Sequence, residues 1–177
     1  MTGKRVWVGA AALCAVVTLG VAGCGDGESD ETPTTPEAAQ PWDPCSLSDE
    51  ALQAATLDPA TEGPGFAAEP PGWKTCGWKT IDQIGIKMSA TATVPVEQFR
   101  NDPRNFDFRD VTVGDRPAFT YVTEIGKPDD FCHLVVPFES GGVLNMQVSH
   151  SVFTKDPTPM CEWAVQVGTA VADELPR

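Results

Sequence analysis

The sequence is poor in basic residues, with 12 Lys and Arg against 25 Asp and Glu in 177 residues and a formal net charge of −13. A protein that binds nucleic acid needs a basic surface to displace counterions from phosphates, and a basic patch is what holds an anionic membrane surface. The composition therefore argues against nucleic acid as a partner and against membrane binding through surface charge. The length and a hydrophobic share of 41% suit one globular domain with appendages.

Motifs that would assign a chemistry are also missing. The two histidines, His133 and His150, form no His-x-His or H-E-x-x-H motif, and no two cysteines have C-x-x-C spacing. The chain also lacks a Gly-x-Ser-x-Gly elbow and a phosphate-binding glycine loop. A triad assembled in space stays open, with Ser149-His150-Ser151 as the nearest local pairing, although we interpret His150 as a structural strand-end residue. We expect no cofactor, no bound metal and no enzymatic activity.

The longest apolar run, Val6–Val21, has 16 residues and no charge, and it follows Lys4 and Arg5. Because a membrane-spanning helix needs ~20 apolar residues, this run is typical of a signal peptide instead. It ends in Val21-Ala22-Gly23-Cys24, which is similar to a bacterial lipobox. We therefore predict a lipoprotein signal peptide over residues 1–23 and a lipid on Cys24. An ordinary secretory signal and an uncleaved anchor are the alternatives.

The segment 24–44 is rich in Asp, Glu, Pro and Thr and has no basic residue. Such a composition cannot bury enough apolar surface to offset chain entropy, so we predict a disordered tether after the lipidated Cys24. The globular domain is then expected over residues 45–177. The predicted location is the extracytoplasmic face of the cell membrane, with the lipid anchor holding the protein to the membrane.

Four cysteines follow Cys24 in the chain: Cys45, Cys76, Cys132 and Cys161. In an exported domain they are most simply two disulfides, for which three pairings exist. The gaps along the chain favour Cys45–Cys76 and Cys132–Cys161. A zinc site built from the four thiolates is the alternative, and the absence of C-x-x-C spacing disfavours it.

Short helices are expected at both ends of this domain. Ser48 is a suitable N-cap for a helix that ends by Leu57, and the segment Pro59–Gly72 is expected to be a long irregular loop. At the other end, Thr158 is a suitable cap with Pro159 at the first helical position. The apolar residues after Pro159 recur at steps of three and four, which is typical of an amphipathic helix.

Between these helices the apolar residues mostly recur at every second position, which indicates half-buried strands. A helical turn is expected over Val94–Arg100. The predicted strands lie within 73–80, 84–92, 109–113, 116–124, 131–138 and 143–150. Helix, strands and helix in this order predict an α+β fold: an antiparallel sheet of about five to six strands, with the N-terminal short helix and the C-terminal helix packed on one face.

The aromatic residues offer one candidate binding site. Trp73 and Trp78 flank Cys76, and the simplest interpretation is that large rings pack beside the disulfides. The alternative is that Trp73, together with Phe66 in the preceding loop, lines a ligand groove. Trp73 and Phe66 are therefore the candidate residues of a ligand groove.

Several of these features occur together in a known order. The lipobox ending at Cys24 and the acidic tether lead into Asp43-Pro44-Cys45, and Cys76-Gly77-Trp78 and the run Val113–Ala118 follow. The chain closes with Cys161 opening a small-residue helix. This pattern resembles the actinobacterial exported lipoproteins grouped as domain of unknown function 3558. The resemblance implies a two-disulfide α+β domain outside the cytoplasmic membrane and no catalytic residues.

The function we expect is that of a non-catalytic binding or interaction module for an unknown envelope ligand or protein. A small-molecule sensor or carrier is the first alternative, and it predicts an apolar pocket between the sheet and the helices. An envelope hydrolase is the second alternative, and it predicts polar residues that converge in a cleft.

Overall fold

The computed structural model of the protein describes residues 39–65, 69–124 and 130–177. The expected signal peptide, the lipidation site at Cys24, the tether up to residue 38 and the groove residue Phe66 lie outside these ranges. Within them, no helix is long and apolar enough to span a membrane.

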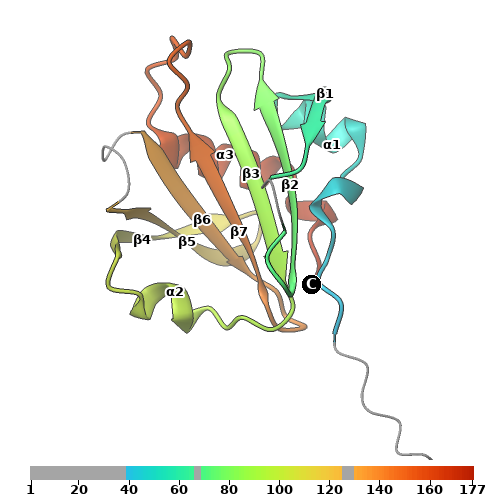
Figure 1. The fold of residues 1–177 in the computed structure, drawn as a ribbon, viewed down its shortest axis with the longest axis vertical. Coiled ribbons are helices and arrows are strands. Elements are labelled where there is room, and N and C mark those ends of the chain that lie inside the picture. Colours follow the sequence, from blue (N-terminus) through green and yellow to red (C-terminus); the bar gives the residue numbers. More distant parts are fainter. Residues whose placement is uncertain (1–38, 66–68, 125–129) are drawn as a thin grey trace, which may run out of the picture. The chain divides into compact units, whose positions relative to one another are not determined.

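Seven strands form one antiparallel sheet in the order β1-β2-β3-β7-β6-β5-β4 (Figure 1). The strands are β1 (Leu57–Gly63), β2 (Trp73–Thr80), β3 (Gly85–Thr91), β4 (Asn105–Val113), β5 (Arg116–Thr123), β6 (Phe131–Pro137) and β7 (Val143–Ser149). The helices are α1 (Asp49–Ala54), α2 (Glu97–Asn101) and α3 (Met160–Ala170), with short 3-10 turns η1 (Pro44–Ser46) and η2 (Ala172–Glu174). The antiparallel sheet is as expected, but the prediction of five to six strands is wrong by one.

The additional strand is β1. The expectation of an irregular loop over Pro59–Gly72 is wrong in its first part, where β1 runs along the edge of the sheet beside β2. The pairing is irregular, with a shift of register between Asp58 and Gly63. Pro59 is tolerated because one side of an edge strand has no hydrogen-bonding partner. Leu57 is only 2% exposed and anchors the start of β1 in the core.

The helix starts differ in how well the sequence predicted them. Ser48 caps α1 as expected, since its Oγ accepts a hydrogen bond from the Ala51 amide at 3.1 Å. At α3 the expected cap is wrong by one residue: Pro159 is the N-cap, and no side chain caps the helix. The reason is local, because the Thr158 amide donates to Asp156 Oδ1 at 2.7 Å and belongs to a turn before the helix.

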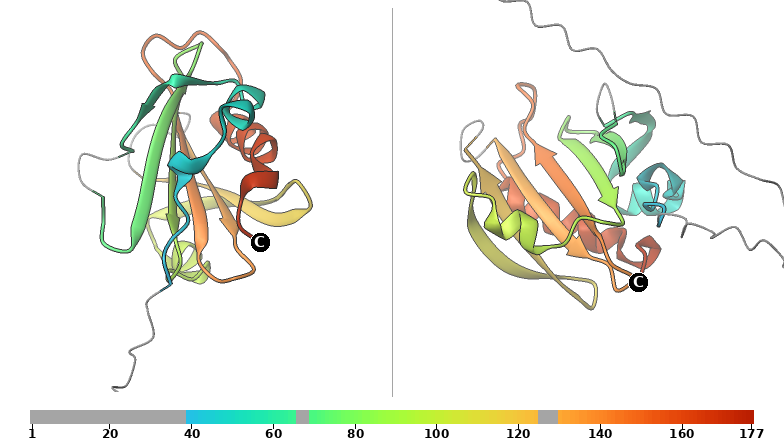
Figure 2. Two further views of the ribbon diagram at one scale, coloured as in Figure 1. Left: turned by 90° about the vertical axis from the view of Figure 1, so that its right-hand side faces the viewer. Right: turned by 60° about the horizontal axis from the view of Figure 1, so that its bottom comes forward.

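One face of the sheet is covered by α3, which contacts β6, β7 and β4. We call it the closed face. Figure 1 shows α3 behind the strands, and the left view of Figure 2 shows α1 and α3 on the same side of them. A hydrophobic cluster fills this face, and its fully buried strand members include Met88, Cys132, Leu134, Leu144, Met146 and Val148. A disulfide between Cys132 and Cys161 joins β6 to α3.

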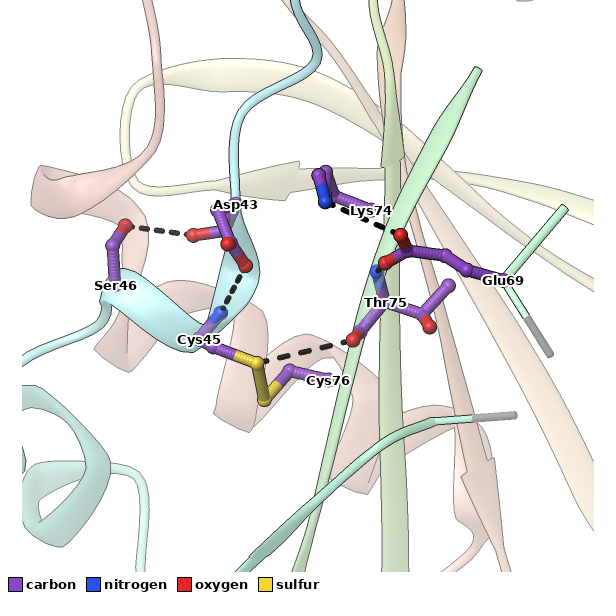
Figure 3. The surroundings of a disulfide bond; sticks show 7 residues. All are labelled: Asp43, Cys45, Ser46, Glu69, Lys74, Thr75 and Cys76. Atoms are coloured by element: carbon purple, nitrogen blue, oxygen red, sulfur yellow. Dashed lines mark hydrogen bonds and ion pairs between the residues drawn. A yellow bond between two sulfur atoms is a disulfide. The ribbon is translucent and has the colours of Figure 1, made fainter. Parts of the chain in front are cut away.

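A second disulfide, Cys45–Cys76, joins η1 to β2 (Figure 3). The turn before it is held locally, because Asp43 Oδ1 accepts a hydrogen bond from the Cys45 amide at 3.0 Å. One residue earlier, the Trp42 ring packs edge-on against Phe138 at 6.4 Å between centroids. The folded part therefore reaches back at least to Trp42, ahead of the boundary expected at Cys45.

The opposite face, which we call the open face, carries polar side chains in register. Lys87 on β3 pairs with Gln147 on β7, which pairs with His133 on β6, and His133 pairs with Tyr121 on β5. A smaller cluster lies beside this row. It contains Phe119, Tyr121, Val135 and Val143, with Val96, Phe99 and Phe108 packed against them. Since Phe99 belongs to α2, that helix covers part of the open face.

Candidate functional site

A cavity of about 260 Å³ opens on the open face, beside α2. It is lined by Trp73, Val94, Gln98, Phe99, Asp102, Arg104, Asn105, Tyr121 and Thr123. Trp73 belongs to β2 and Tyr121 to β5, and three strands separate β2 from β5 in the sheet order. The two residues line one cavity because Phe99 of α2 contacts both of their rings.

Aromatic rings form one wall of the cavity. The Trp73 and Phe99 rings meet nearly at right angles, at 83° with 6.5 Å between centroids. Phe99 in turn lies 6.2 Å from Tyr121. The His133 ring stacks on Tyr121 from the next strand, at 4.7 Å and an interplanar angle of 14°. Because edge-to-face and offset contacts of this kind are favourable, the wall is preorganised.

The turn between α2 and β4 places an ion pair in the cavity. Arg104 Nε and Nη2 donate to the two oxygens of Asp102 at 2.9 and 2.6 Å, and the Arg104 amide also donates to Oδ1. These hydrogen bonds lower the pKa of Asp102 to about 2 and raise the pKa of Arg104. Both groups therefore stay charged at neutral pH, and their charges cancel within the cavity.

The other polar groups of the cavity are neutral. Asn105 Nδ2 donates to the Phe99 carbonyl at 2.8 Å, which leaves its Oδ1 available. In the part of the chain that the structure describes, the side-chain amide of Gln98 and the Thr123 hydroxyl make no hydrogen bond. The Tyr121 hydroxyl donates to Asn145 Oδ1 over a long 3.4 Å. The cavity thus offers several donors and acceptors without a net charge.

Of the two groove residues predicted from the sequence, Trp73 lines this cavity and Phe66 lies outside the described ranges. Trp78 follows the simpler interpretation, since it is 2% exposed and packs in the closed-face cluster with Cys76. Strand residues five apart point to opposite faces, which separates the two tryptophans. Sequence reasoning missed Phe99, Tyr121 and Asn105, because they come from three separate elements.

The family model described as protein of unknown function (DUF3558) matches residues 19–174, nearly the whole chain. The chain belongs to the DUF3558 family. The resemblance drawn from the order of the motifs is thereby confirmed. No curated protein and no solved structure matches the chain. DUF3558 membership assigns no activity, so the function must be argued from the geometry.

Three titratable groups on the open face of this DUF3558 chain have shifted pKa values: Lys87, Tyr121 and His133. Burial, with a smaller contribution from the positive Lys87, lowers the pKa of His133 to about 4. Burial also lowers the pKa of Lys87 and raises that of Tyr121 to about 12. His133 and Tyr121 are therefore neutral at pH 7. Among the described residues, His133 Nδ1 is buried without a hydrogen-bond partner.

A second cavity, of about 340 Å³, contains His150 together with Asp107 and Arg109. Asp107 and Arg109 form an ion pair at 2.9 Å. In the described ranges the His150 side chain has no hydrogen bond to a serine hydroxyl or a carboxylate. The local Ser149-His150-Ser151 pairing therefore does not form the nucleophile–base contact that acyl-transfer catalysis uses.

The four sulfurs that a zinc site would require are bonded in pairs. One metal-like group occurs among the described residues, formed by Cys45, Cys76 and Glu62. Its two sulfurs belong to one disulfide, so they are not thiolates, whereas a zinc ligand is a thiolate. This corner of the DUF3558 fold is a covalent link between η1 and β2.

Proposed function

We propose that the chain is a lipoprotein displayed outside the cytoplasmic membrane, and that its folded domain is a non-catalytic binding module. The N-terminal part of this proposal comes from the sequence, where Lys4 and Arg5, an uncharged apolar run and Val21-Ala22-Gly23-Cys24 follow in the order of a lipoprotein signal. The two disulfides support it, because disulfides persist in oxidising compartments. In this arrangement α1 and α3 close one sheet face, and the other face is left to partners.

The observation that carries the binding function is the Trp73 cavity. Aromatic rings and neutral hydrogen-bonding groups line it, and its two charged groups are paired with each other. Binding sites are typically concave and aromatic, with a few polar groups that fix the orientation of the ligand. We place the ligand or the anchoring side chain of an envelope partner here.

The alternatives have less support. A hydrolase needs a nucleophile held by a base, and His150 has no such contact among the described residues. A carrier that encloses its cargo needs a larger apolar chamber, because drug-sized ligands occupy about 300–1,000 Å³. The Trp73 cavity, at about 260 Å³, suits surface binding better than enclosure.

The lipid anchor can be tested in cells that export the full chain. We expect the natural chain to fractionate with membranes and to incorporate an alkyne-labelled fatty acid. A Cys24→Ala variant should lose both properties, whereas a Cys14→Ala variant should keep both. Equal labelling of the Cys24→Ala variant would show that the lipid is not on Cys24.

The binding site can be tested by photo-crosslinking in the same cells. A benzophenone amino acid is placed at Glu97, which begins α2 beside the cavity, and in a control chain at Glu162, which is exposed in the first turn of α3. We expect a discrete adduct from position 97 that Trp73→Ala abolishes, and none from position 162. An adduct that forms equally well in the Trp73→Ala variant would place the binding surface elsewhere.

A further inference from the structure

We propose that the Trp73 cavity binds a neutral, hydroxyl-rich ring of the hexopyranose type, either free or as one residue of a glycan. The proposal rests on the binding function proposed above and adds the chemical class of the ligand. It follows from three properties of the cavity: its cancelled charge, its combination of rings with neutral polar groups, and its size.

The charge of the cavity argues against an ionic ligand. Asp102 and Arg104 are its only charged residues, and both carboxylate oxygens of Asp102 accept hydrogen bonds from Arg104. Asp102 occupies Nε and Nη2 of Arg104, so an anionic ligand is left with Nη1 and is repelled by the Asp102 carboxylate, and a cationic ligand is repelled by Arg104 in the same way. Breaking this bidentate, charge-assisted pair costs free energy that a neutral ligand does not need to supply.

The remaining groups match the surface of a sugar ring. A pyranose has a face of C–H groups and an edge of hydroxyls that both donate and accept hydrogen bonds. Trp73 is half-buried, and its near-perpendicular contact with Phe99 does not stack the two ring faces on each other. The Gln98 amide and the Thr123 hydroxyl can each donate and accept, and Asn105 Oδ1 can accept. An aromatic face and convergent neutral groups therefore lie in one cavity.

The size limits the ligand to about one ring. The cavity volume of about 260 Å³ lies just below the ~300–1,000 Å³ of sites for drug-sized molecules. A longer glycan would place one residue in the cavity and leave its neighbours outside. A free sugar and a glycan residue thus present the same chemistry to the protein, and the experiment has to separate them.

The test is saturation-transfer NMR on the detergent-solubilised full chain. The probes are methyl glucoside, methyl mannoside, methyl galactoside and maltotetraose, with glucuronate and glucosamine as charged counterparts. We expect saturation transfer to at least one neutral sugar and weaker saturation transfer to both charged sugars. Trp73→Ala should weaken binding at least tenfold, and Phe153→Ala, which removes an exposed ring that does not line the cavity, should leave it unchanged. Stronger saturation of maltotetraose than of methyl glucoside would identify a glycan residue as the source.

The ion pair gives a sharper test of the charge argument. Asp102→Asn leaves Arg104 unpaired and should raise the ratio of glucuronate to methyl glucoside binding several-fold. Arg104→Gln should raise the ratio for glucosamine in the same way. Asp107→Asn removes an equivalent carboxylate from the separate Asp107–Arg109 pair and should change neither ratio.

Three results would overturn the proposal. Preference of the natural chain for glucuronate or glucosamine would mean that Asp102 or Arg104 binds the ligand directly. Absence of saturation for every neutral sugar, with a Trp73-dependent adduct still formed from position 97, would reject the sugar and keep the binding function. Absence of both the saturation and the adduct would reject the two proposals together.

Discussion

The two faces of the sheet are built from the same strands but differ in chemistry. On β7, Leu144, Met146 and Val148 point to the closed face and are fully buried, while Asn145 and Gln147 point to the open face and are half-buried. Both disulfides also have their strand cysteine on the closed face, at Cys76 and Cys132. The closed face thus supplies stability, and the open face is free to carry the polar and aromatic groups of a binding site.

Reduction of both disulfides is expected to have the largest effect on the stability of the domain. The bonds span 31 and 29 residues, so each contributes about 3–4 kcal/mol in the chain-entropy model. The total of about 7 kcal/mol is comparable with the ~5–15 kcal/mol stability of an ordinary domain. Dithiothreitol should therefore unfold the domain, as measured by near-UV circular dichroism.

The paired variants Cys45→Ala/Cys76→Ala and Cys132→Ala/Cys161→Ala serve as controls for the reduction. Each double variant should stay folded, and its free energy of unfolding, measured by urea denaturation, should fall by about half of this total of about 7 kcal/mol. A native near-UV spectrum of the fully reduced chain would show that the closed face does not depend on its covalent links.

The next largest effect is expected within β7. Leu144 is fully buried on the closed face, so Leu144→Ala should cost about 2–5 kcal/mol of unfolding free energy through lost contacts and a cavity. Gln147 is half-buried on the open face and its side chain makes no hydrogen bond among the described residues, so Gln147→Ala should cost less than about 1 kcal/mol. Urea denaturation measures both values. Equal losses would mean that the open face is also a packed core.

The sequence predicted the closed face better than the open one. Alternation along β3 and β7 indicated which residues share a face, the chain gaps favoured the cysteine pairs that the structure joins, and Ser48 marked the start of α1. The edge strand β1 was missed because Pro59 and the glycines around it are typical of a loop. The cavity was missed except for Trp73, since its residues come from β2, α2, β4 and β5 and meet only where α2 packs on the sheet.

An effect of intermediate size is expected from His133 on the open face, which should make the stability of the domain depend on pH. His133 has a pKa of about 4 in the folded chain and an ordinary value of 6.5, so the unfolded chain binds more protons between these values. Stability must then fall as the pH drops from 6.5 to 4, by about 1–3 kcal/mol from this residue. His133→Gln should remove that part of the pH dependence of urea denaturation, and His150→Gln, at an exposed site, should retain it. Parallel curves for the natural chain and His133→Gln would mean that folding does not lower the pKa of His133.

The smallest effect is expected at the rim of the open face, where Arg100 on α2 contacts Asp110 and the rings of Phe108 and Phe119. Its Nη2 lies 2.6 Å from Asp110 Oδ1, and its guanidinium carbon lies 4.1 Å from the centroid of the Phe119 ring. Exposed ion pairs and cation–π contacts each contribute about 0.2–1 kcal/mol, so Arg100→Gln should cost about 1 kcal/mol in urea denaturation. Arg109→Gln removes an exposed ion pair for which no ring contact is found among the described residues, and it should cost less than half as much. Equal losses would show that the ring contacts of Arg100 add nothing to the stability.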